Sequence, residues 1–116
     1  MPTRGEIGFF NEDGTVNVIY NHYDNYLDRT GLDLITNWNS EERAKEAVLE
    51  AKYNNNNYQT YSSVKEWLDN ISGLDREFVY LWNDKWYFIE CDKDFNFKDD
   101  WKEVSEELKK EMREMF

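Results

Sequence analysis

The sequence predicts an α+β fold, in which two β-hairpins join in one antiparallel sheet that about three helices pack against. Three observations predict it. Short runs rich in aromatic and β-branched residues occur in two pairs with turn residues between them. Three later segments carry apolar residues at helical spacing. The 116 residues contain no repeat and no linker-like stretch, so we expect a single domain over residues 1–116.

Each hairpin is predicted from a pair of runs and the turn between them. The first pair is Glu6–Phe10 and Thr15–Tyr20, separated by an Asp-Gly turn in which Gly14 tolerates the positive φ that a tight turn needs. The second pair is Glu77–Trp82 and Lys85–Cys91. Both faces of the second hairpin are apolar, so we expect helices to cover one face and a loop or a partner to cover the other.

Helices are predicted over residues 40–52, 63–71 and 99–115, and a shorter one over residues 31–38. Residues 21–29 fit no clean period and are predicted to form a structured loop. Residues 53–61 contain four consecutive Asn and are predicted to form an exposed, mobile loop of low complexity. The C-terminal helix carries the longest apolar stripe, which consists of Trp101, Val104, Leu108, Met112 and Met115.

The charge balance favours a basic partner over a nucleic acid. The chain has 25 acidic and 14 basic residues, a formal net charge of −11, and phosphate backbones repel such a surface. Residues 76–116 hold 12 of the 25 carboxylates, which is compatible with a nucleic-acid mimic that occupies a basic groove. The eight Lys and Arg residues of the same stretch weaken that interpretation, since a solvated helix face has the same composition.

The single histidine suggests one candidate site. In an extended chain His22, Asp24 and Tyr26 would project to one side, where a His and a carboxylate can act as a base and its orienting group. The same residues can instead contact a ligand or partner, or hydrogen-bond the backbone and hold the loop in shape. One His and one Cys are too few for a closed transition-metal site.

The sequence contains no complete motif for binding a cofactor or a metal ion. Asp92–Asn96 is similar to the start of a calcium loop, but Phe97 stands at the sixth position, where that loop requires Gly. Cys91 follows an apolar run and is expected to be buried rather than reactive. We therefore predict no cofactor and no metal. The N-terminal residues include no long apolar run, so we expect neither a secretory signal nor a membrane span, and a cytoplasmic location.

Two parts of the chain resemble a family of small, mostly uncharacterised bacteriophage proteins. The first is Thr3-Arg4, then Asp13-Gly14-Thr15-Val16, then a Tyr-x-His-x-Asp-x-Tyr signature at residues 20–26. The second is Val64–Leu68 together with Phe78-Val79-Tyr80 and Lys85-Trp86-Tyr87. The chain departs from the family at Asn21, where Cys is frequent, and at Asn25, where Gly is frequent. The resemblance implies no established chemistry, but small acidic phage proteins are often inhibitors of host defence, including anti-CRISPR and anti-restriction proteins.

Together these observations predict a protein-binding inhibitor of a host nuclease or immune effector, and no enzyme. Its partner would be a host protein with a basic surface, in the host cell cytoplasm. The predicted contact residues are two loop residues, three aromatic residues and four carboxylates, namely His22, Asp24, Tyr23, Tyr26, Trp82, Asp92, Asp94, Asp99 and Glu103. Two alternatives stay open: a small-molecule or signalling-nucleotide binder near His22, and a small hydrolase centred on His22 and Asp24.

Overall fold

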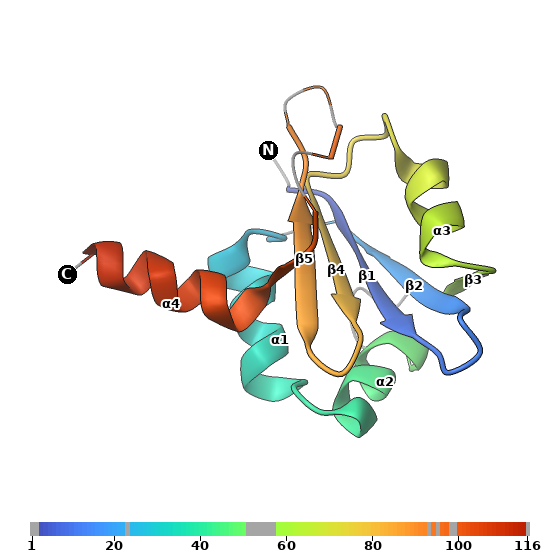
Figure 1. Ribbon diagram of the computed structural model, residues 1–116, viewed down its shortest axis with the longest axis horizontal. Coiled ribbons are helices and arrows are strands. Elements are labelled where there is room, and N and C mark those ends of the chain that lie inside the picture. The colour runs from blue at the N-terminus through green and yellow to red at the C-terminus, as the bar shows by residue number, and fades with distance from the viewer. Residues whose placement is uncertain are drawn as a thin grey trace.

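A mixed β-sheet runs through the centre of the molecule (Figure 1). The computed structural model describes residues 3–22, 24–50, 58–92, 94, 96–97 and 100–115. Within these residues the sheet has six strands, in the order β3-β2-β1-β4-β5-β6. With the helices on its two faces it forms one α+β unit, as the sequence predicts.

Both predicted hairpins are present. β1 (Gly5–Phe10) pairs with β2 (Val16–Asn21), and β4 (Phe78–Trp82) pairs with β5 (Trp86–Glu90). In the first turn Gly14 has a φ of 90°, which explains the preference for glycine there.

The prediction that the two hairpins join in one antiparallel sheet is wrong. β1 and β4 lie side by side in parallel, so the sheet is mixed. The parallel pairing places β4 in the interior of the sheet, between β1 and β5. An interior strand needs apolar residues on both faces, and this is the reason for the two-sided apolar pattern of the second hairpin.

Two short strands at the edges were not predicted. β3 (Gln59–Tyr61) pairs with β2, although its residues fall in the segment 53–61 that was predicted to be a loop. Residues 53–57 of that segment lie outside the described residues. β6 (Lys102–Glu103) pairs with β5, within the segment predicted to be helical. Strands of two or three residues are too short to show an alternating pattern.

The helices follow the predicted segments with shifted ends. A π-helical turn, η1 (Leu27–Gly31), leads into α1 (Leu32–Asn37), and α2 (Glu41–Leu49) and α3 (Val64–Ile71) follow. The side chains of Ser40 and Ser63 cap α2 and α3 by accepting hydrogen bonds from backbone N–H groups. α4 (Val104–Met115) begins at residue 104 rather than 99, because the residues before it extend along β5.

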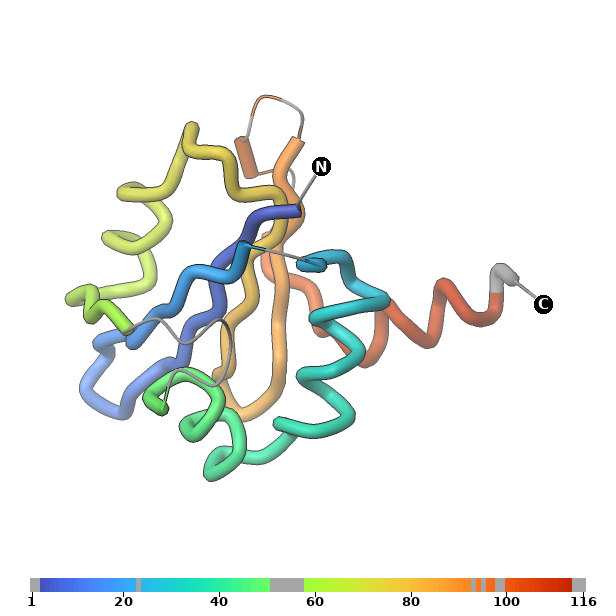
Figure 2. The backbone as a smooth tube through the Cα atoms, turned by 180° about the vertical axis from the view of Figure 1, so that it is seen from behind, coloured from blue at the N-terminus to red at the C-terminus, as the bar shows by residue number. Residues whose placement is uncertain are grey.

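Strand alternation divides the core between the two faces of the sheet. On one face, residues of η1, α1, α2 and α4 cover Ile7, Phe9, Ile19, Phe78, Tyr80, Trp82, Trp86 and Phe88. On the other face, α3 covers Val16, Val18, Val79 and Leu81. Gly8 lies under α3, and a Cβ there would come within 2.9 Å of the Trp67 indole. This glycine therefore lets the indole approach the sheet closely. Figure 2 shows α4 extending away from the rest of the molecule towards the C-terminus.

The predicted stripe of the C-terminal helix is only half buried. Val104 and Leu108 are buried against the sheet, whereas Met112 is 58% exposed. Trp101 precedes the helix and packs on the opposite face of the sheet, with its ring centroid 6.2 Å from that of Trp67. The side chain of Met115 lies outside the described part.

Candidate binding site

A pocket of about 300 Å³ opens where η1 and α4 meet the sheet. η1 reaches this place because Asp24, with a φ of 57°, turns the chain after β2. α4 reaches it because Val104 and Leu108 anchor its first turns on the same face. The residues lining the pocket are Tyr26, Leu27, Asp28, Phe78, Phe88, Glu90, Asp100, Lys102, Glu107 and Glu111.

Aromatic rings form the apolar part of the pocket. Tyr26 is 48% exposed and meets Phe78 edge-on, with ring centroids 5.9 Å apart and an interplanar angle of 69°. Phe78 and Phe88 are buried and belong to the core of this face. Because both are held by the sheet, the rings offer a preformed surface for a ligand group.

Carboxylates surround these rings. Asp28, Glu90, Asp100, Glu107 and Glu111 line the pocket together with one ammonium group, that of Lys102, so five negative charges face one positive charge. Glu107 and Glu111 are one helical turn apart on α4 and therefore lie on the same side of that helix.

The carboxylates of this pocket affect the pKa of Tyr80, a buried tyrosine beside it. Tyr80 has its ring against those of Phe78 and Phe88. Burial is the main cause that raises the pKa of Tyr80, and the negative charges of Asp28, Glu90 and Glu111 raise it further. Carboxylates together with exposed aromatic surface suit a cation, since ring faces and negative charges both attract positive groups.

The loop around His22 is held by buried polar contacts. The amide of Asn25, which has no exposed surface, donates to the carbonyls of Thr3 at 2.7 Å and Asn21 at 2.8 Å. The hydroxyl of Tyr80 donates to the carbonyl of Asn25 at 2.7 Å, and that of Thr30 donates to the carbonyl of Asp24 at 2.7 Å. Asn25 is thus the centre of this network.

The prediction that His22, Asp24 and Tyr26 project to one side assumes an extended chain. The left-handed backbone at Asp24 breaks that extension. Nδ1 of His22 lies 2.7 Å from the hydroxyl of Tyr20, on the strand before the loop, while Tyr26 precedes η1 and lines the acidic pocket. Asp24 is exposed, and its backbone carbonyl accepts a hydrogen bond from the hydroxyl of Thr30. The three residues thus have separate surroundings.

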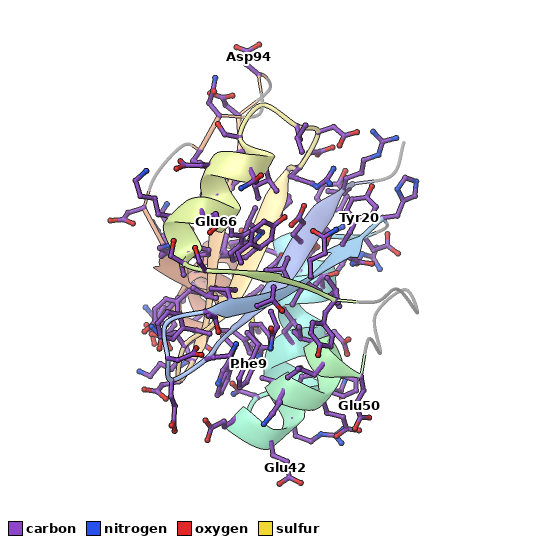
Figure 3. The ribbon with its side chains drawn as sticks, turned by 90° about the vertical axis from the view of Figure 1, so that its right-hand side faces the viewer. Phe9, Tyr20, Glu42, Glu50, Glu66 and Asp94 are labelled. Atoms are coloured by element: carbon purple, nitrogen blue, oxygen red, sulfur yellow. The ribbon has the colours of Figure 1, made fainter. Side chains whose placement is uncertain are left out.

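The remaining predicted contact residues are spread over the molecule. Trp82 is 6% exposed and packs against Trp86 at 5.5 Å, as a core residue does. Asp92 accepts hydrogen bonds from the backbone N–H groups of Asp94 and Asn96, so it shapes the turn after β5. Asp94 is exposed at the tip of that turn, at the opposite end of the molecule from Glu42 (Figure 3).

The other three predicted contact residues are Glu103, Tyr23 and Asp99. Glu103 lies in β6, with a carboxylate oxygen 3.9 Å from the ammonium of Lys85. Tyr23 and Asp99 lie outside the described residues. Of the predicted contact residues that the structure describes, Tyr26 is the one that lines the acidic pocket.

Sequence reasoning did not identify the other lining residues. Glu107 and Glu111 belong to the 12 carboxylates of residues 76–116, and their spacing of four residues places them on one helix face. Phe78 and Phe88 are indistinguishable in sequence from the other core aromatics. That they meet η1 and α4 follows from tertiary packing alone.

Neither a metal centre nor a membrane-spanning helix is found in the part of the chain that the structure describes. No group of three or more His, Cys, Asp or Glu side chains there is arranged to hold a metal ion. No helix there has both the length and the apolar character needed to cross a membrane. Cys91 is buried, as the sequence predicts.

Comparison of the chain with protein-family models, curated proteins and solved structures found no significant match.

Proposed function

We propose that this protein is a binding module that docks onto a positively charged protein through the acidic aromatic pocket. The observation that carries the proposal is the pocket itself, in which five carboxylates surround the rings of Tyr26, Phe78 and Phe88. A Lys or Arg side chain of a partner would place its charge among the carboxylates and its stem or guanidinium plane on the rings.

The two parts of the pocket would act at different stages of binding. The net charge of −11 attracts a basic surface during diffusional encounter and raises the association rate. The rings of Tyr26 and Phe78 provide the contact that is desolvated in the complex, and such contacts determine how slowly a complex dissociates.

The nature of the partner is proposed from charge and from the resemblance to small phage proteins. Proteins that handle nucleic acids present basic grooves, and an acidic protein can occupy such a groove in place of the phosphate backbone. We therefore propose an inhibitor of a host defence nuclease or related immune effector, which acts by stoichiometric binding in the host cytoplasm. Neither catalysis nor direct binding of a nucleic acid is part of this proposal.

The test is a capture experiment with matched variants. Tagged wild-type protein is used as bait in a bacterial lysate, and co-eluting proteins are identified by mass spectrometry. The double reversal Glu107→Lys/Glu111→Lys removes charge from the pocket, and the control Glu12→Lys/Glu42→Lys makes the same charge change at the opposite end of β1.

We expect the wild type and the control variant to capture a basic protein that the pocket variant does not capture. Its release should need only moderate salt, because exposed charges are screened beyond about 8 Å at physiological ionic strength. Capture of the same proteins by all three baits would contradict the proposed site. If a captured nuclease keeps its activity in the complex, the inhibitory role is contradicted.

A further inference from the structure

A second cavity, of about 390 Å³, lies on the other face of the sheet, beside α3. Val18 and Ile71 form its apolar base. Tyr20, Tyr61 and Arg76 line it from β2, from β3 and from the loop between α3 and β4. Its volume is within the range of small-molecule sites, which are mostly apolar with a few placed polar groups.

Arg76 is held rigidly in this cavity. Its Nε donates to Oε2 of Glu6 at 2.6 Å, and its Nη1 donates to Asp75 at 2.8 Å. The guanidinium carbon lies 4.4 Å from the centroid of the Tyr20 ring. A guanidinium has five N–H donors in a fixed plane, so several remain after these two bonds. Among the described residues, none accepts a hydrogen bond from Nη2.

Glu6 fixes that arginine and has no free oxygen to offer. Its side chain is 6% exposed, and its Oε1 accepts a hydrogen bond of 2.8 Å from Nε1 of Trp67. The two oxygens of the carboxylate are therefore each bonded to a neighbour inside the protein. Glu6 serves as a support for Arg76 and not as a ligand group.

Two tyrosines make the aromatic walls. Arg76 covers a face of Tyr20, and the hydroxyl of Tyr20 lies 2.7 Å from Nδ1 of His22. The hydroxyl of Tyr61 donates to Oε1 of Gln59 at 3.1 Å, which leaves the Gln59 amide N–H groups as donors. Burial chiefly, and then the charge of Glu6, raise the pKa of Tyr61 above 10.0, so its hydroxyl is neutral at physiological pH.

The charges around the cavity select against charged ligands. The positive charge of Arg76 is matched by Glu6 and Asp75, and Arg4 pairs with Asp75 in turn. Two cations thus face two carboxylates, and no excess charge remains to bind an ion. The net charge of −11 further repels anions.

We propose that this cavity binds a neutral, planar heteroaromatic molecule of nucleoside size. Its ring would stack on Tyr61, and its carbonyl or ring-nitrogen acceptor would accept from the remaining donors of Arg76, with Gln59 at the rim. Amide and guanidinium donors beside aromatic rings are the groups that read the edge of a base while the ring stacks. The site is on the opposite face of the sheet from the acidic pocket, so it is independent of the proposed docking function.

The test is a titration of the intact, ¹⁵N-labelled protein with adenosine, guanosine, cytidine and uridine, and with their 5′-monophosphates. The Nε–H of Arg76, which lines the cavity, reports on it directly, and the Trp67 indole N–H reports on it through its hydrogen bond to Glu6. We expect at least one nucleoside to shift both signals, and to bind at least as tightly as its monophosphate.

Matched variants locate the binding. Tyr61→Leu should weaken nucleoside binding about tenfold through the lost stacking, and Tyr58→Leu, an exposed tyrosine outside the cavity, should not. If Tyr61→Leu fails to fold, the exposed Gln59→Ala serves instead, with an expected loss of about fivefold. The proposal is overturned if no nucleoside shifts the two signals, if the monophosphates bind more tightly, or if the Tyr58 and Tyr61 variants weaken binding equally.

Discussion

Nε1 of Trp67 donates a 2.8 Å hydrogen bond to Oε1 of Glu6, and this bond joins α3 to β1 across 61 residues of sequence. Trp67 has no exposed surface, and Glu6 is buried at the same place. A buried indole N–H needs an acceptor, and a buried carboxylate needs donors or a cation. The pair therefore satisfies two groups that would each be costly alone.

Glu6→Ala should lower the free energy of unfolding by about 3 kcal/mol, because it leaves the Trp67 N–H without an acceptor and Arg76 without its closest carboxylate. Chemical denaturation monitored by tryptophan fluorescence measures this. The exposed Glu12→Ala is the control and should change stability by less than about 0.5 kcal/mol. Equal effects of the two substitutions would show that the Glu6 contacts do not stabilise the fold.

Two positions on α4 should respond differently to the same substitution. Leu108→Asp should cost about 3 kcal/mol, because it buries an unpaired charge at a site that is 7% exposed. Met112→Asp, one turn later and 58% exposed, should cost less than about 1 kcal/mol. Thermal melts of both variants measure the difference. A large loss at Met112 would mean that this part of the stripe is covered in solution.

These two α4 positions show what a helical period can and cannot predict. The spacing correctly predicted the face of α4, since Val104 and Leu108 are buried. The spacing did not predict the residue at which the helix extends beyond the sheet. The length of an apolar stripe does not depend on the size of the surface against which the helix packs. Trp101 fits the same period but belongs to the segment before the helix, where Lys102 pairs with Phe88 of β5.

The strands show a similar division. Turn residues and alternation predicted both hairpins closely, because each hairpin is a local structure. The pairing of Gly5 with Phe78 is non-local, and nothing in either strand specifies its neighbour. The acidic pocket depends on that pairing and on the packing of η1 and α4, so the sequence could place Tyr26 in a candidate site without indicating the rings around it.

Stability should fall at alkaline pH. Burial raises the pKa of Tyr80 above the value of 10.0 for an exposed tyrosine. The unfolded chain therefore loses this proton first, so the stabilisation is complete below pH 10.0 and decreases as the pH rises above it. Urea denaturation from pH 8 to 11 measures the slope. Tyr80→Phe should make the slope shallower, and Tyr58→Phe should leave it unchanged. Identical slopes for the wild type and Tyr80→Phe would contradict this account.

Tyr26 should control how long a complex lasts. Tyr26→Ala removes the exposed ring of the pocket, so it should raise the dissociation rate from the captured partner about tenfold and change the association rate little. Surface plasmon resonance separates the two rates. Tyr58→Ala, which removes an exposed ring elsewhere, is the control. An unchanged dissociation rate would remove Tyr26 from the interface.

The association rate of the captured partner, measured across a salt series, tests the docking mechanism most directly. We expect Glu107→Lys/Glu111→Lys to lower this rate at least tenfold at low salt and to flatten its salt dependence, because both carboxylates line the pocket. The control Glu12→Lys/Glu42→Lys makes the same change in net charge and should have a much smaller effect. If the two double variants slow association equally, or if salt does not change the wild-type rate, then the acidic pocket is not the docking site.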